Sequence, residues 1–290
     1  LKATQITAMT ADQVAGITAG QSALLTAAQV AGFSATNVTK LTDDAVAGLT
    51  TKALPSLKNE AIAVLSDSQI GKLSVDQIKV MTPKQVTAFT SGQLGKFTDD
   101  QMGALTAAQV GSLSDAQITG LSAAQIGKLS NAAVGGLKAS QISGMSDTQL
   151  EGLSVAQAGA LTAAQVGALS ADDIKKFSDD EIAALSPKAI PGLKNEAIAA
   201  LTESQVGKLS TDQLKQVTTK QITAFTSGQL AKFTDDQIGA LSAAQVGALT
   251  NDQIGGLTAG QIGKLSNAAV AGLKATQITA MTADQVAGIT

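Results

Sequence analysis

The chain has 290 residues, a net charge of −3 and 44% hydrophobic residues, yet it contains no His, Cys, Trp, Tyr or Arg and only six Phe. Without His or Cys the usual proton shuttle, the thiol nucleophile and thiolate metal sites are missing, and an acidic chain without Arg lacks the basic, aromatic surface that binds nucleic acid. We therefore expect no enzymatic activity, catalytic residue, cofactor, metal site or nucleic-acid partner, and no apolar stretch reaches the ~20 residues of a membrane span.

An eight-residue period begins at the first residue. An apolar residue recurs every eight positions, from Leu1, Met9 and Ile17 to Ile289, and a second apolar site follows five positions later, as at Ile6. Numbering each octad from the first apolar residue gives the consensus Leu-Thr/Ser-x-x-Gln-Ile/Val-x-x. Internal repeats of this kind indicate a solenoid or an array and not a globular domain.

The first fully regular octad, residues 25–32, indicates the local structure. Thr26 followed three places later by Gln29 is a capping box, and Leu25 with Val30 is the accompanying hydrophobic staple. This pattern predicts a helix over 27–32, with acids at positions three to five and Lys at seven and eight as the helix dipole favours. Gly at positions seven and eight is interpreted as the helix terminator. A strand would place the two apolar sites on opposite faces, and the apolar stripe of a continuous helix would wind around it.

The same interpretation assigns roles to the later octads. The capping residues are predicted to include Thr26, Gln29, Thr106, Gln109, Thr162, Gln165, Ser242 and Gln245. The core is predicted to include Leu25, Val30, Leu105, Val110, Leu161, Val166, Leu241 and Val246. Positions three, four and seven are expected to lie largely outside.

Several octads depart from the consensus. Ser22 and Ala158 replace the aliphatic residue of position six, and Pro55 and Pro191 fall at position seven. Lys takes the place of the capping residue in five octads, at Lys2, Lys58, Lys138, Lys194 and Lys274. These irregularities are either kinks or lateral contact sites, or drift inherited through duplication.

Paired acids are the one pattern that suggests a metal. They are Asp43 and Asp44, Asp99 and Asp100, Asp179 and Asp180, and Asp235 and Asp236. They lack the alternating spacing of a calcium loop. We interpret them as first-turn acids.

A longer period of seventeen octads lies on top of the octad. Residues 49–94 match 185–230, and residues 1–18 recur unchanged at 273–290. We expect a single continuous array over 1–290, with superrepeats 1–136 and 137–272 and the start of a third at 273–290. The ends have the character of cuts through a longer array.

A lone octad cannot fold. Burying two aliphatic side chains contributes roughly 3–6 kcal/mol, whereas ordering eight residues costs about 8–16 kcal/mol of backbone entropy. The octads must therefore stack, and the predicted fold class is an all-α solenoid or superhelix of very short capped helices, one per octad. Because Glu would serve the capping box equally well, the preference for Gln suggests that its amide also donates across to a neighbouring helix or turn, as a polar ladder.

The octad, as in residues 161–170 (LTAAQVGALS), resembles the arrays of large bacterial surface and adhesin-like repeat proteins. The resemblance implies an extracellular or cell-surface structural segment of a filament, sheath or adhesin stalk, acting by length, stiffness and self-association. The alternatives are a solenoid that binds a protein or glycan, and, as a third class, an ice-binding protein that uses its recurrent Thr.

Overall fold

The computed structural model describes residues 1–289, and in that range it contains short helices and no β-strand. The predicted all-α solenoid is confirmed. Almost every octad of sequence forms one helix of four to six residues, while two octads form the 3-10 helices η1 and η2. None of the helices within residues 1–289 combines the length and apolar character that crossing a membrane requires.

Residues 105–112 show how one octad folds. Thr106 is extended (φ −84°, ψ 160°), and its side chain accepts a hydrogen bond from the backbone N–H of Gln109, which starts α13 (Ala107–Ser112). The helix ends at Leu113, which is extended again (φ −57°, ψ 151°) and donates its N–H to the carbonyl of Val110. An extended Leu-Thr/Ser pair therefore interrupts the helix once per octad.

Glycine ends several helices, as expected of positions seven and eight: Gly16, Gly48 and Gly136 are C-cap residues, all in the right-handed conformation. No residue among 1–289 has a positive φ. The chain leaves each helix directly through the extended residue of position one, so a left-handed cap is not needed. Several glycines also lie where two backbones approach closely: a Cβ on Gly136 would lie 2.6 Å from the carbonyl oxygen of Ala107.

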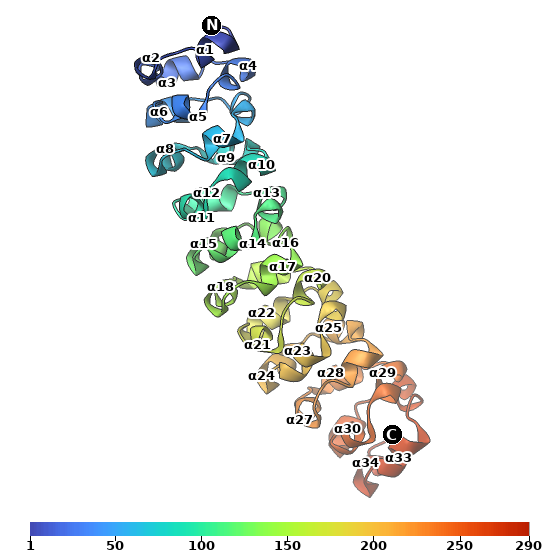
Figure 1. Cartoon of the computed structure of the whole chain (residues 1–290). Coiled ribbons are helices and arrows are strands. Elements are labelled where there is room, and N and C mark those ends of the chain that lie inside the picture. The colour runs from blue at the N-terminus through green and yellow to red at the C-terminus, as the bar shows by residue number, and fades with distance from the viewer. Residues whose placement is uncertain (290) are drawn as a thin grey trace. The chain divides into compact units, whose positions relative to one another are not determined.

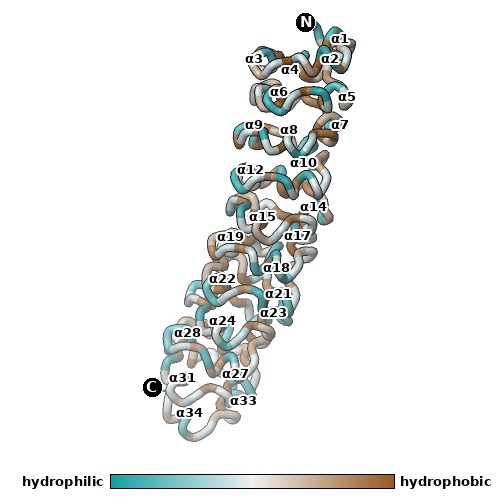
Figure 2. The backbone as a smooth tube through the Cα atoms, turned by 90° about the vertical axis from the view of Figure 1, so that its left-hand side faces the viewer, coloured by the Kyte–Doolittle hydropathy of each residue, from teal (hydrophilic) through white to brown (hydrophobic). Residues whose placement is uncertain are grey.

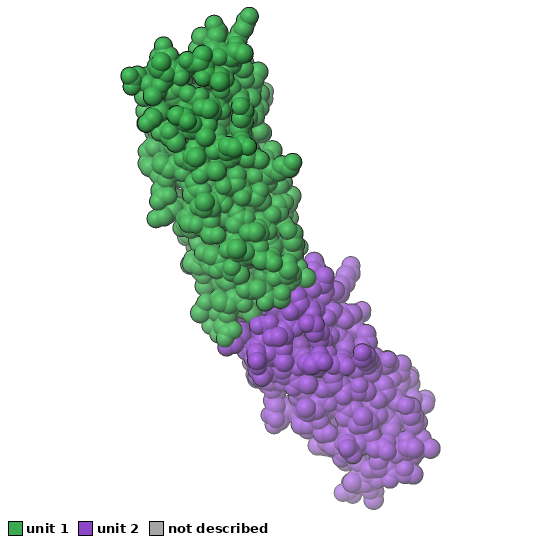
Figure 3. Space-filling view, viewed as in Figure 1, with its two compact units in different colours: residues 1–152 green, residues 153–290 purple. Residues whose placement is uncertain are grey.

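The chain divides into two compact units, residues 1–152 and 153–290 (Figure 3). Their boundary lies two octads beyond the end of the first superrepeat. The first unit contains α1 (Ala3–Thr7), α2 (Ala11–Ala15), α3 (Ala19–Ser22), α4 (Ala27–Val30), α5 (Ala35–Val38), α6 (Asp43–Ala47), η1 (Leu54–Ser56), α7 (Asn59–Ile62), α8 (Asp67–Lys72), α9 (Val75–Val80), α10 (Pro83–Ala88), α11 (Ser91–Leu94), α12 (Asp99–Ala104), α13 (Ala107–Ser112), α14 (Asp115–Thr119), α15 (Ala123–Lys128), α16 (Asn131–Gly135), α17 (Ala139–Ser143) and α18 (Asp147–Glu151).

The second unit repeats this plan. It contains α19 (Val155–Gly159), α20 (Ala163–Val166), α21 (Ala171–Ile174), α22 (Asp179–Ala184), η2 (Pro187–Gly192), α23 (Asn195–Ala200), α24 (Glu203–Lys208), α25 (Thr211–Gln216), α26 (Thr219–Ile222), α27 (Ser227–Leu230), α28 (Asp235–Gly239), α29 (Ala243–Ala248), α30 (Asn251–Gly255), α31 (Ala259–Ile262), α32 (Asn267–Val270), α33 (Ala275–Ala280) and α34 (Ala283–Ala287).

Within each unit a helix packs against the helix three octads before it and the helix three octads after it. In the first unit α13 contacts α10 and α16, and in the second α28 contacts α25 and α31. Three octads therefore complete one turn of the solenoid, and Figure 1 shows the successive turns of each unit as rungs of short helices. The octad pattern does not specify this number.

The core of each unit is formed by positions one and six. Leu105 and Val110 are 1% and 0% exposed, and the position-one rings of successive octads meet inside, as Phe89 and Phe97 do edge to face with centroids 5.2 Å apart. Hydrophobic and hydrophilic stretches alternate along the backbone of each unit in Figure 2. In the octad 105–112, positions three and seven are half-buried and position four is exposed, in line with the outward placement expected of them.

Candidate functional site

The most regular polar feature of the chain is the glutamine of position five. In α13 the Gln109 Oε1 atom accepts the backbone N–H of Thr106 at 2.8 Å, which completes the capping box. The amide nitrogen of the same side chain donates to the carbonyls of Ile78 and Met81, both at 2.8 Å. One buried amide therefore caps its own helix and also holds the preceding turn of the solenoid.

This arrangement recurs at fixed sequence offsets. The Nε2 atom donates to a position-one carbonyl 28 residues earlier and, in most cases, to a position-six carbonyl 31 residues earlier. The amides that make both bonds belong to Gln69, Gln77, Gln85, Gln101, Gln109, Gln141, Gln149, Gln205, Gln213, Gln221, Gln229, Gln237, Gln245, Gln253, Gln261, Gln277 and Gln285. We call this set the glutamine ladder, and it has the cross-turn donation that the sequence hypothesis requires.

The ladder makes sense energetically because the position-one residue is extended. Its carbonyl accepts no backbone N–H within residues 1–289. A buried carbonyl without a partner costs about 1–3 kcal/mol. The amide supplies the donor that a carboxylate cannot.

The named capping residues all lie at helix starts. Thr26 and Ser242 accept the backbone N–H of Gln29 at 3.4 Å and of Gln245 at 3.2 Å. Thr162 accepts the N–H of Gln165 at 3.4 Å. These hydroxyls therefore act as acceptors in capping, as expected of position two.

The named core residues lie in the interior with one exception. Val30, Leu105, Val110, Leu161, Val166, Leu241 and Val246 are all buried. Leu25 is only half-buried, so its placement in the core is wrong. It lines an open pocket with Leu1, Met9 and Ile17, where only residues 1–24 precede it in the stack and their own apolar side chains are partly uncovered.

Ser22 is the clearest polar defect of the interior. Its side chain is fully buried at position six, and its Oγ atom has no hydrogen-bond partner among residues 1–289. Its counterpart in the second superrepeat, Ala158, is equally buried without a hydroxyl.

Replacing Ser22 with alanine is expected to stabilise the chain. A buried hydroxyl without a partner costs about 1–3 kcal/mol, whereas the loss of one oxygen atom leaves only a small gap. Urea unfolding should show a midpoint above that of the unaltered chain. A lower midpoint would mean that the hydroxyl has a partner that stabilises the fold.

Charged side chains connect the turns on the outside. Position eight lies over position three of the octad three places earlier, and ion pairs join Lys128 to Asp99 and Lys264 to Asp235, each at 3.0 Å. Similar pairs join Lys96 to Asp67 and Lys232 to Glu203. The side chains of all these ion pairs are half-exposed or more, so each ion pair contributes little to stability. Its main effect is on the register between the two turns.

The first acid of each predicted pair contacts the next turn. Asp99 and Asp235 are in ion pairs, and Asp43 and Asp179 each accept a hydrogen bond from a serine hydroxyl of the next turn, at Ser68 and Ser204. Within residues 1–289 no three acidic side chains gather as a metal site would require.

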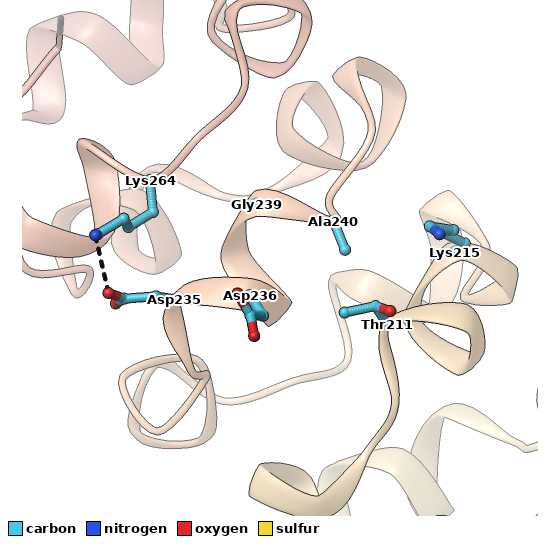
Figure 4. A pocket seen from close by; sticks show the side chains of 7 residues that line it. All are labelled: Thr211, Lys215, Asp235, Asp236, Gly239, Ala240 and Lys264. Carbon is cyan, nitrogen blue, oxygen red and sulfur yellow. Dashed lines mark ion pairs between the residues drawn. The ribbon is translucent and has the colours of Figure 1, made fainter.

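One surface groove occurs in both units at equivalent positions. In the second unit it is lined by Thr211, Lys215, Asp235, Asp236, Gly239, Ala240 and Lys264. Figure 4 shows the Asp235–Lys264 pair on one side, Lys215 on the opposite side, and Asp236 and Ala240 between them. In the first unit the groove is lined by the residues seventeen octads earlier, with Val75 in the place of Thr211. The groove offers two ammonium groups and two carboxylates over a floor of small residues.

Comparison with known proteins supports the repeat architecture. The model of a family described as the ALTTAQ repeat matches residues 206–243, from α24 to the start of α29. No curated protein matches the chain. The match supports a repeat-based structural protein.

Proposed function

We propose that this chain is a structural segment of an extracellular bacterial filament, sheath or adhesin stalk, without enzymatic activity. It acts through length, stiffness and association with further copies of itself. The cell-surface location rests on the resemblance of the octad to bacterial surface arrays and on the absence of Cys, which suits an oxidising environment.

The glutamine ladder is the observation that carries this proposal. Most turns are held to the preceding one by side-chain bonds to backbone carbonyls, and the same bonds serve whatever residues occupy positions three, four, seven and eight. Such an interface repeats without limit and leaves the outer surface free to vary. In such repeat proteins the total stability is a sum of the interfaces between neighbouring repeats. They are therefore suited to forming long structures and not one enclosed binding site.

Electron microscopy and analytical ultracentrifugation of the purified chain test the self-association. We expect linear assemblies whose mass grows with protein concentration. Monodisperse single particles over the whole micromolar range would contradict self-association, and a hydrolytic or transferase activity of the pure chain would contradict the non-enzymatic role.

The duplicated groove favours a second function, binding of a protein or glycan. Its charges of both signs suit a ligand with carboxylate and amino or hydroxyl groups. A panel of purified glycans should then bind the chain, and changing Lys215 and Asp236 to alanine, together with Lys79 and Asp100, should abolish that binding. Equal binding by this variant would remove the groove from consideration.

A further inference from the structure

The glutamine ladder is interrupted at the same place in each superrepeat. Three consecutive octads, residues 41–64, carry alanine at position five, at Ala45, Ala53 and Ala61. In residues 177–200 the corresponding residues are Glu181, Ala189 and Ala197. Three octads are one full turn, so each superrepeat has one turn without any amide at position five.

The consequence is visible in the hydrogen bonds. No side chain of residues 41–64 donates to the turn 17–40, and none of 177–200 donates to the turn 153–176, among residues 1–289. The turn that follows the first gap is different, because Gln69, Gln77 and Gln85 together donate seven bonds to residues 38–57. Single octads elsewhere also lack the donor, at Ala133, Asp173 and Ala269. Within residues 1–289, a whole turn of three octads without it occurs at these two interfaces, and we call each of them a ladder gap.

Other irregularities gather at the same interfaces. The buried, unpaired Ser22 hydroxyl belongs to the turn beneath the first gap. Inside the gaps, Lys58 and Lys194 begin α7 and α23 without a side-chain cap, and η1 and η2 replace α-helices around Pro55 and Pro191. Each superrepeat therefore has one interface at which the ladder bonds, a side-chain cap and a regular α-helix are all missing.

Close packing is what remains at a ladder gap. A Cβ on Gly48 would lie 2.5 Å from the carbonyl oxygen of Ala19, and Ala45 and Ala61 are fully buried. Small side chains let the turns approach, but a separation of about 0.5–1 Å already removes roughly a quarter to a half of the packing attraction. Two turns held together by packing alone fit closely in the closed state, but little opposes their separation once they begin to part.

We propose that each superrepeat contains a yielding joint at its ladder gap, where the stack opens first, while the laddered turns between the joints stay closed. In a stalk or filament under tension this would confine opening to one place in every superrepeat and allow it to reclose. The inference concerns the internal order of opening, so it stands or falls separately from the proposed self-association.

Limited digestion of the folded chain with trypsin tests the joints directly. The lysines of the gaps (Lys52, Lys58, Lys188 and Lys194) and those of laddered turns (Lys72, Lys79, Lys96, Lys128, Lys215, Lys232 and Lys264) are all exposed, so exposure alone predicts equal cleavage. Because proteolysis follows the population of locally opened states, we expect cleavage at the gap lysines to be at least about tenfold faster. Mass spectrometry should then detect a fragment of residues 59–194, released by cleavage after Lys58 and Lys194 and equal in length to one superrepeat.

A matched variant separates the ladder from other features of the gap. Changing Gln69, Gln77 and Gln85 together to alanine creates a new gap in a turn with regular caps, and cleavage at Lys72 and Lys79 should rise to the rate of Lys52 and Lys58. Cleavage at Lys232 and Lys264 serves as the internal control and should not change. Uniform cleavage of the unaltered chain at all exposed lysines would overturn the proposal, as would a folded triple variant with unchanged cleavage at Lys72 and Lys79.

Discussion

Replacing Gln109 with glutamate is expected to destabilise the chain by roughly 3 kcal/mol or more, because two hydrogen-bond donors are exchanged for a buried charge. The side chain is 1% exposed, and its amide nitrogen lies 2.8 Å from two carbonyl oxygens that a carboxylate would repel. Alanine at the same site should cost less, about 1–2 kcal/mol, since it only removes the bonds. Urea unfolding of the three proteins measures this order.

Gln13 provides the control for this substitution. Its Oε1 atom accepts the N–H of Thr10 as in other capping boxes, but the side chain is exposed and its amide nitrogen has no partner within residues 1–289. Gln13→Glu should therefore leave the unfolding midpoint nearly unchanged. If Gln109→Glu proved as mild as Gln13→Glu, the ladder would contribute nothing to stability.

Adding a methyl group to glycine should have opposite effects at two sites of the first unit. A Cβ at Gly136 would lie 2.6 Å from the Cα, Cβ and carbonyl oxygen of Ala107, so Gly136→Ala forces the two turns apart and should cost about 1–3 kcal/mol. A Cβ at Gly71, inside α8, meets nothing within 4 Å. Gly71→Ala should therefore stabilise by roughly 0.5–1 kcal/mol through the helix propensity of alanine.

Thermal unfolding of the two single variants and the unaltered chain checks this pair. If the turns approach closely at Gly136, the melting temperature of Gly136→Ala should lie below that of the unaltered chain. That of Gly71→Ala should be equal to it or higher. Stabilisation by both changes would show that the backbones of α13 and α16 are not in contact.

The helix positions could be predicted from sequence because their signals are local. Thr106, Gln109 and their counterparts lie three residues apart, and the capping box specifies the start of a helix within a single turn. The inward-facing role of the glutamine could be predicted in the same way, because the sequence prefers Gln at a position where Glu would serve the capping box equally well. The position of glycine at helix ends was predicted, but its close approaches to a neighbouring turn were not, because a helix end and a close backbone contact favour the same residue.

The number of octads per turn depends on contacts between distant residues, and no local rule supplies it. The sequence nevertheless carries a signal. Only eight of the 36 complete octads have an acid at position three, yet seven of the eight lysines at position eight have Asp or Glu 29 residues earlier. That offset is three octads plus five residues, the register that the ion pair of Lys128 with Asp99 displays. Leu25 was misplaced because burial there depends on how many turns lie on either side, which the octad pattern does not encode.

Engineered disulfides test the central claim, three capped octads per turn, most directly, because the chain has no Cys of its own. The Asp115 carboxylate of α14 and the Ser140 hydroxyl of α17 are 3.2 Å apart across one turn. Cysteines at these two positions should form an intramolecular disulfide on mild oxidation, whereas Asp115→Cys combined with Ala132→Cys or Thr148→Cys, one octad nearer or farther, should not. Cross-linking of either displaced pair as readily as the 115–140 pair would contradict the three-octad turn.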